Sequence, residues 1–141
     1  MMIVFCLAFG QKSFLHEKQF QKVVEFYLED HNPEYKVMGV STYNEREEYI
    51  LRIDMNDSAS DTLKPSRVFE SLAIVSQFSK ILINGFVVIF HDSKGQSNPA
   101  IYTAEVACTN DCFLTKIMSL SDWKGTCLIS RMNPQTNLNN R

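Results

Sequence analysis

The first third of the chain carries apolar residues at the spacing of an amphipathic helix. Residues 17–30 set one apolar stripe against a face of lysine, glutamine and glutamate. The stripe consists of Phe20, Val23, Val24, Tyr27 and Leu28. The Asn32-Pro33 pair ends the pattern, because the residue before a proline is pushed out of the helical conformation. We therefore predict a first helix over residues 17–30.

The pattern then changes to the period of two that is typical of strands. Residues 36–43 (KVMGVSTY) are rich in β-forming residues. In residues 49–55, Leu51 and Ile53 alternate with Arg52 and Asp54, as in a half-buried strand. The polar NEREE stretch between these segments is typical of a hairpin loop.

A second helix, followed by two more strands, is predicted in the middle of the chain. Residues 67–82 keep near-helical spacing of large apolar residues. These are Val68, Phe69, Leu72, Val75, Phe78, Ile81 and Leu82. Asn84-Gly85 ends the helix. Residues 86–90 (FVVIF) are apolar at every position, which indicates a strand at the centre of its sheet. The loop HDSKGQSNP and a strand over residues 101–108 follow.

This order of elements predicts an α+β fold. Two helix–hairpin (αββ) units in series would join into a four-stranded antiparallel sheet with both helices on one face. After Cys108 the periodicity is weaker. We expect a short helix beginning near Asn110 or Asp111, another turn near Ser121, and an extended segment over residues 127–132.

The ends of the chain differ from its middle. Residues 3–9 are wholly apolar, and Ala8-Phe9-Gly10 has the small-x-small form of a signal-peptide cleavage site, but no basic residue precedes Lys12. Two interpretations of residues 1–10 stay open: a truncated signal-peptide remnant, or a strand or helical turn of the fold. Residues 11–132 are predicted to form a single α+β domain. The polar residues 133–141 are predicted to be a disordered tail.

Charge and hydropathy narrow the classes of partner. The chain has 141 residues, 14 basic and 16 acidic side chains, and a net charge of −2. It has no basic stripe that would neutralise phosphates, so we expect no nucleic-acid binding. No apolar run reaches the roughly 18 residues of a membrane-spanning helix. The expected partner is a protein or a small ligand.

Whether the four cysteines form disulfides depends on the compartment in which the protein works. Cys108, Cys112 and Cys127 are disulfide candidates if the protein is secreted or periplasmic, whereas a cytoplasmic location would keep all thiols reduced. Cys112 is the preferred partner of Cys127, because Cys108 continues an alternating strand and can bury its sulfur there. A zinc site formed by these three cysteines and His91 is disfavoured, because C-x3-C is the one close pair.

Candidate catalytic residues are few. His91-Asp92-Ser93 follows a buried strand, but neighbouring strand residues point to opposite faces, so turn chemistry explains this stretch better than a triad does. No cofactor motif is present, and no metal or cofactor site is predicted. The favoured hypothesis is a non-enzymatic, exported or surface-associated binding domain. One alternative is a small enzyme that uses His91 with Cys108 or Cys112. The other is a cytosolic, chaperone-like partner-binding protein.

Overall fold

The computed structural model describes residues 15–57 and 64–131. The first seven elements are α2 (Glu17–His31), β1 (Lys36–Glu45), β2 (Glu48–Asp57), α3 (Pro65–Val75), the 3-10 turn η1 (Ser76–Phe78), β3 (Gly85–Asp92) and β4 (Ala100–Glu105). They are followed by α4 (Val106–Phe113), α5 (Leu120–Thr126) and β5 (Ile129–Arg131). The predicted order of helix, hairpin, helix and two further strands is present, and two short helices and a fifth strand follow it.

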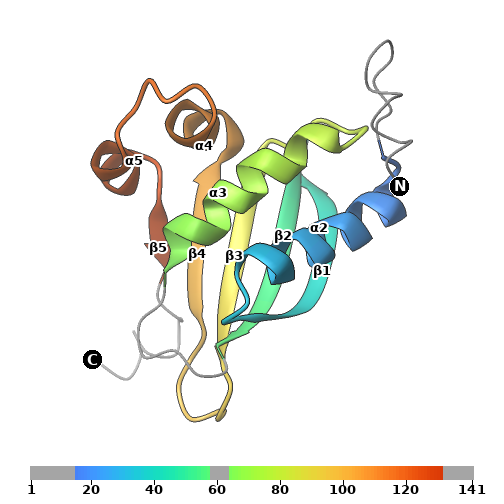
Figure 1. Ribbon diagram of the computed structural model, residues 1–141, viewed down its shortest axis with the longest axis vertical. Helices are drawn as coiled ribbons and strands as arrows, with labels where there is room; N and C mark the ends of the chain where they lie inside the picture. Colours follow the sequence, from blue (N-terminus) through green and yellow to red (C-terminus); the bar gives the residue numbers. More distant parts are fainter. Residues whose placement is uncertain (1–14, 58–63, 132–141) are drawn as a thin grey trace.

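The five strands form one mixed sheet in the order β1-β2-β3-β4-β5 (Figure 1). The α+β class is confirmed, but the prediction of four antiparallel strands is wrong in two respects. A fifth strand pairs with β4, and β3 runs parallel to β2. The parallel pair arises because α3 carries the chain back to the starting end of β2 before β3 begins. The strand over residues 86–90 does lie at the centre of the sheet, as predicted.

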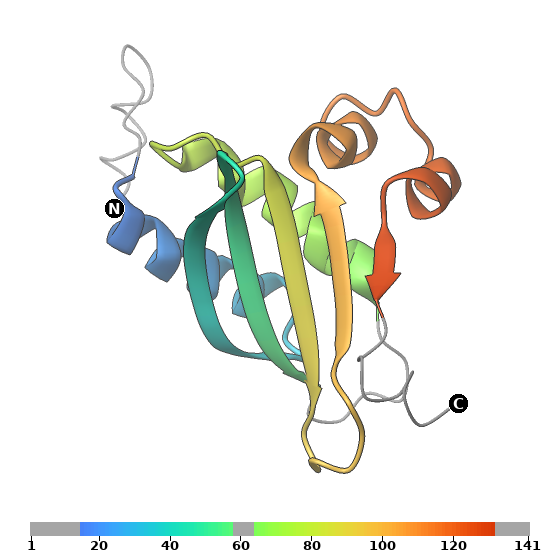
Figure 2. The ribbon, with the colours of Figure 1, turned by 180° about the vertical axis from the view of Figure 1, so that it is seen from behind.

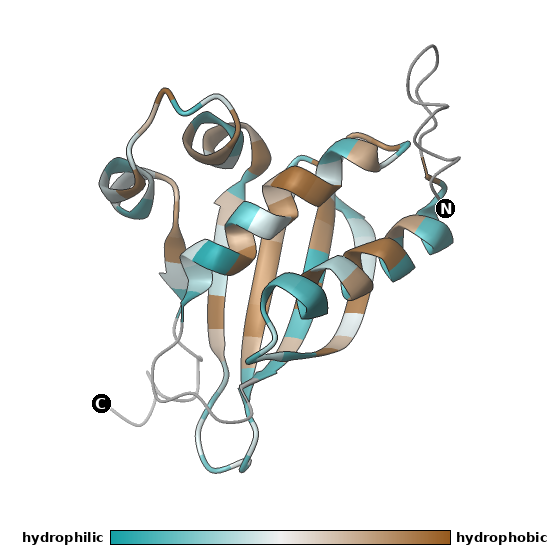
Figure 3. Cartoon of the chain, viewed as in Figure 1, coloured by the Kyte–Doolittle hydropathy of each residue, from teal (hydrophilic) through white to brown (hydrophobic). Residues whose placement is uncertain are grey.

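Helices α2 and α3 lie side by side over one face of the sheet, and Figure 2 shows the opposite face free of helices. Strand residues that face α2 and α3 are fully buried, among them Leu51, Ile53 and Met55 of β2 and Val88 of β3. Figure 3 shows this hydrophobic band running along β3. Burying these side chains against the helix stripes supplies the main driving force for folding.

The second helix is shorter than the sequence predicts. α3 ends at Val75 rather than near Leu82, and η1 then leads the chain away from the sheet. The backbone of Leu15 pairs with this segment: its N–H donates to the carbonyl of Phe78, at 2.8 Å. Phe78, Ile81 and Leu82 are consequently exposed, although helical spacing placed them on the buried stripe. The helical spacing of apolar residues thus continues to Leu82, although α3 ends at Val75 and the following segment pairs with Leu15.

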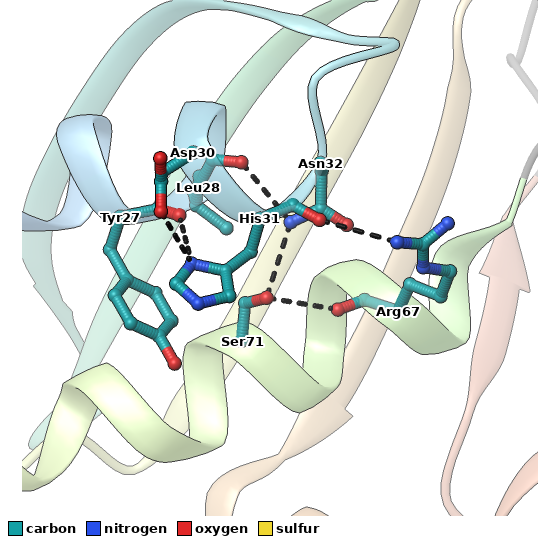
Figure 4. Close-up of polar contacts among 7 residues, drawn as sticks. All are labelled: Tyr27, Leu28, Asp30, His31, Asn32, Arg67 and Ser71. Carbon is teal, nitrogen blue, oxygen red and sulfur yellow. Dashed lines mark hydrogen bonds and ion pairs between the residues drawn. The ribbon is translucent and has the colours of Figure 1, made fainter.

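A buried amide fastens the end of α2 to α3. Asn32 is fully buried, and its Nδ2 donates to the carbonyl of Leu28 and to Oγ of Ser71, both at 3.2 Å (Figure 4). Arg67 donates to the carbonyl of His31 from the same side of α3. His31 Nδ1 lies 3.0 Å from the carbonyl of Tyr27, and the two rings stack. These contacts satisfy the free carbonyl groups at the end of α2, so their role is structural.

The region after β4 differs from the prediction in its boundaries. β4 ends at Glu105, and Cys108 lies in the first turns of α4 instead of on a strand. Ser119, not Ser121, caps α5 by accepting a hydrogen bond from the Asp122 N–H. The expected extended segment is present as β5. Residues 1–10 and 133–141, which carry the predicted signal remnant and tail, lie outside the described residues.

Candidate functional site

The open face of the sheet presents polar and apolar rows side by side. Alternation along β2 points Ile50, Arg52 and Asp54 away from the helices. The strand register sets Arg52 beside Val87 of β3, and Val87 beside Thr103 of β4. The helix-free face is therefore neither uniformly polar, as a solvated face would be, nor uniformly apolar.

A groove of about 390 Å³ crosses this face between the β1–β2 hairpin and β5. Its floor includes Gly85, Val87 and Thr103, and Ile129 contributes an exposed apolar side chain. Gly85 keeps the floor open: a Cβ at that position would approach Cδ1 of Ile50 to 3.0 Å. The absence of a side chain at Gly85 thus lets the Ile50 side chain pack over the backbone of β3, where it contributes an apolar base to the groove.

Three carboxylates line the end of the groove next to the hairpin. They belong to Glu45, Glu48 and Glu105, all of them exposed. No ion pair found in residues 15–57 and 64–131 involves any of the three. Arg131 lies among the lining residues contributed by β5. The groove therefore combines an apolar floor with a predominantly negative rim.

A disulfide forms part of the groove wall. It joins Cys108 of α4 to Cys127, which directly follows α5, with the Cα atoms 5.9 Å apart. The predicted pairing of Cys112 with Cys127 is wrong. It assumed that Cys108 lies on a strand and buries its sulfur there, whereas Cys108 lies on α4 and is bonded to Cys127. Cys112 is a buried free thiol one helical turn further along. Burial raises the pKa of the Cys112 thiol, which is typical of an unreactive cysteine.

A charged network occupies the other end of the open face. Arg52 donates two hydrogen bonds to the Asp54 carboxylate, both at 3.0 Å, and His91 Nε2 lies 2.8 Å from Asp54 Oδ1. Burial raises the pKa of Asp54, but the hydrogen bonds from Arg52 and His91 outweigh it, so this pKa lies below its usual value. Asp54 is thus held as a carboxylate, and the network acts as a fixed polar border.

The structure separates the residues of the enzyme hypothesis. His91 lies six residues along β3 from Gly85, and Gly85 is opposite Glu105, where β4 passes into the helix of Cys108. At the rise of a strand this separation is about 20 Å. His91 is therefore remote from Cys108 and Cys112, and the same distance separates it from the other ligands of the disfavoured zinc site. Within the described ranges, no three metal-ligating side chains cluster.

The loop after His91 has the turn role that its composition predicts. Asp92 accepts hydrogen bonds from the backbone N–H groups of Lys94, Gln96 and Ser97, at 2.9–3.0 Å. These bonds lower the pKa of Asp92. The carboxylate is committed to the loop and is not available as a catalytic base.

Two features of the site have partial sequence correlates. The polar residues Arg52 and Asp54 on a strand with one apolar face do indicate an open sheet face. Asn84, interpreted as a helix stop, instead accepts the Tyr49 N–H through its side chain and the Val106 N–H through its carbonyl. It links β2 to the junction of β4 and α4, a role that depends on contacts distant in sequence.

Comparison with known proteins gives no relative from which a function could be transferred. No protein-family model, curated protein or solved structure matches this chain. In the part of the chain that the structure describes, no helix is long and apolar enough to cross a membrane. The function therefore has to be argued from the geometry of the open face.

Proposed function

We propose that this protein is a non-enzymatic binding domain that holds a segment of a partner protein in the groove of its open face. The observation that carries the proposal is the apolar groove with its rim of three carboxylates that make no ion pair with described residues. An apolar floor favours burial of an aliphatic or aromatic group. The rim favours a cation beside it. The groove thus favours a segment in which lysine or arginine neighbours large apolar residues.

The rigid surroundings of the groove support binding over catalysis. The floor belongs to the central strands, and the disulfide ties the wall formed by α4 to the start of β5. A preformed groove loses little entropy when it is occupied. The titratable network of Arg52, Asp54 and His91 is internally paired rather than directed at the groove.

We also propose that the protein works in an oxidising compartment, exported or at a cell surface. The Cys108–Cys127 disulfide supports this location, because such bonds persist where glutathione and thioredoxin do not reduce them. The apolar residues 3–9 and the small-x-small stretch Ala8-Phe9-Gly10 provide the second, sequence-based support.

The binding proposal is tested by selecting peptides of about twelve residues from a random displayed library and measuring their affinity by fluorescence anisotropy. Selected peptides should contain lysine or arginine next to large apolar residues. Ile129→Asp, which places a charge beside the apolar floor, should weaken binding about tenfold or more. The matched control is Ile117→Asp, because Ile117 is exposed on the α4–α5 connection and does not line the groove. Its affinity should equal that of the wild type.

The role of the rim is tested separately. Glu48→Gln combined with Glu105→Gln should weaken the selected peptides several-fold, and the effect should fade at high salt, as expected for exposed charges. Peptides that bind equally well to the wild type and to Ile129→Asp would contradict the groove as the site. Peptides that need Ile129 but carry no basic residue would contradict the role given to the carboxylates.

A further inference from the structure

β1 is an outer strand of the sheet and exposes a backbone edge. It has ten residues, and in the described part of the chain it pairs with β2 alone. Glu45 and Glu48 flank a two-residue hairpin loop, Arg46-Glu47, in which both residues have positive φ. The flanking pair of such a loop exchanges hydrogen bonds, and the direction alternates from there. The N–H and C=O groups of Val40, Thr42 and Asn44 therefore point outward.

A contact at the other end of β1 agrees with this alternation. The N–H of Val37 donates to Oε2 of Glu29 on α2, at 3.0 Å, instead of to β2. The bulge between Val37 and Gly39 leaves Met38 without a partner on β2. Because the bulge adds one residue, Lys36 regains the same face of the sheet as Glu45. The face on which each β1 side chain lies, and the β1 residues whose N–H and C=O groups point outward, are thus defined.

We propose that two copies of this chain pair antiparallel through their β1 edges and form one continuous ten-stranded sheet. A two-fold axis beside Ser41 places each strand along the full length of its copy. In this register Val40 lies opposite Thr42 of the second copy, and this pair exchanges backbone hydrogen bonds on each side of the axis. Ser41 meets its own copy in the closer, non-bonded pair, where a small side chain fits.

The side chains of this register are complementary to themselves. Lys36 lies opposite Glu45 of the second copy, so an opposite-charge pair closes each end of the strand pair. Tyr43, which is 38% exposed, lies opposite Gly39, where its ring covers a backbone that has no side chain. Sliding the strands by two residues would place Glu45 opposite Gly39 and leave Lys36 without a partner. The full-length register is the one that uses both charged ends.

Helix α2 carries a second complementary row along the same edge. Lys18, Lys22, Glu25 and Glu29 follow one ridge at helical spacing, with the lysines in its first half and the glutamates in its second. This ridge neighbours β1, because Gln21 bonds Thr42 and Glu29 bonds Val37. The axis beside Ser41 therefore passes α2 at the level of the middle of the helix. Two such helices related by it run antiparallel, which brings the lysine half of each toward the glutamate half of the other.

Charge exchange tests the proposal on the full chain. Sedimentation velocity over a wide concentration range should show a monomer–dimer equilibrium for the wild type. Lys36→Glu alone and Glu45→Lys alone should each raise the dimer dissociation constant about tenfold or more, because every change alters two symmetry-related contacts and sets like charges opposite each other. The combined variant Lys36→Glu/Glu45→Lys should return to within about threefold of the wild type.

Controls separate this surface from folding and from a general effect of charge. Lys124→Glu, an exposed charge change on α5, should leave the dimer unaffected. The thermal midpoint of each variant is measured to check that the variant is folded. The variants Lys22→Glu, Glu25→Lys and their combination repeat the charge exchange on the α2 row, with the same expected loss and recovery of the dimer. A wild type that stays monomeric at every concentration overturns the proposal. So does a dimer that the single changes do not weaken, or one that the combined change does not restore.

Discussion

Removing the Cys108–Cys127 disulfide should destabilise the protein without unfolding the region that contains α5. The bond spans a sequence separation of 19 residues and closes a loop that contains α5. α5 has an anchor of its own: Trp123 is fully buried, and its indole N–H donates to Oγ1 of Thr109, at 3.2 Å. The indole also packs against the rings of Phe69 and Phe113. We therefore expect α5 to remain docked when the bond is absent.

The expected cost follows from the length of the loop. In the chain-entropy model, closing a loop of about 20 residues restricts the unfolded chain enough to stabilise the folded state by about 3 kcal/mol. For a chain of this size that loss corresponds to a fall of roughly 10 °C in the thermal midpoint. The folded structure should change little, except that β5, which pairs with β4 over a short stretch, should exchange its amide hydrogens faster.

The assay uses the single tryptophan of the chain. Thermal unfolding followed by Trp123 fluorescence should show the fall when the wild type is treated with dithiothreitol. Cys108→Ala/Cys127→Ala should unfold near the reduced wild type and be insensitive to the reductant. Cys112→Ala should keep the sensitivity, because Cys112 is outside the bond.

Two results would refute this reasoning. The first is a wild type whose midpoint does not respond to reduction although mass spectrometry shows the bond intact beforehand. The second is a peptide map of the non-reduced protein, isolated from its native compartment, in which Cys112 is joined to Cys127. If Cys108, Cys112 and Cys127 are all alkylated as free thiols, the oxidising compartment loses its structural support.

Three further predictions concern the core, the pH dependence and the first residues. Phe69→Ala and Leu72→Ala should each lower the free energy of unfolding by about 2 to 5 kcal/mol in urea titrations, since both side chains are fully buried; a loss under about 0.5 kcal/mol at both would contradict their place in the core. The pKa of Asp54 lies below its usual value, so its carboxylate stabilises the fold above about pH 4, and this contribution disappears as the pH falls through the native pKa. Asp54→Asn should therefore be less stable than the wild type at pH 7 and approach it at pH 3, whereas a constant difference would contradict the network. Deleting residues 1–10, which lie outside the described residues, should move the thermal midpoint by less than a few degrees, and a larger fall would show that they belong to the core.

Local patterns were sufficient for much of the fold. The periods of 3.6 and 2 located α2, the β1–β2 hairpin and the strand at the centre of the sheet, because each element buries one face and therefore repeats its apolar residues at its own spacing. The turn role of Asp92 also followed from its neighbours, since its bonds reach no further than a few residues along the chain.

The tertiary structure decided the direction of the strands, the pairing of the cysteines and the contacts between residues distant in sequence. A strand has the same side-chain period in parallel and antiparallel sheets, so the pattern of β3 could not show that it runs alongside β2 in the same direction. Cys112 was preferred as the partner of Cys127 because the alternating pattern predicted a strand through Cys108. The strand ends at Glu105, and Cys108 lies on α4, where it is bonded to Cys127. His91 meets Asp54 for a similar reason: the two lie 37 residues apart, and the parallel register of β2 and β3 brings them to one end of the open face. Such contacts depend on how whole elements pack, and no local period carries that information.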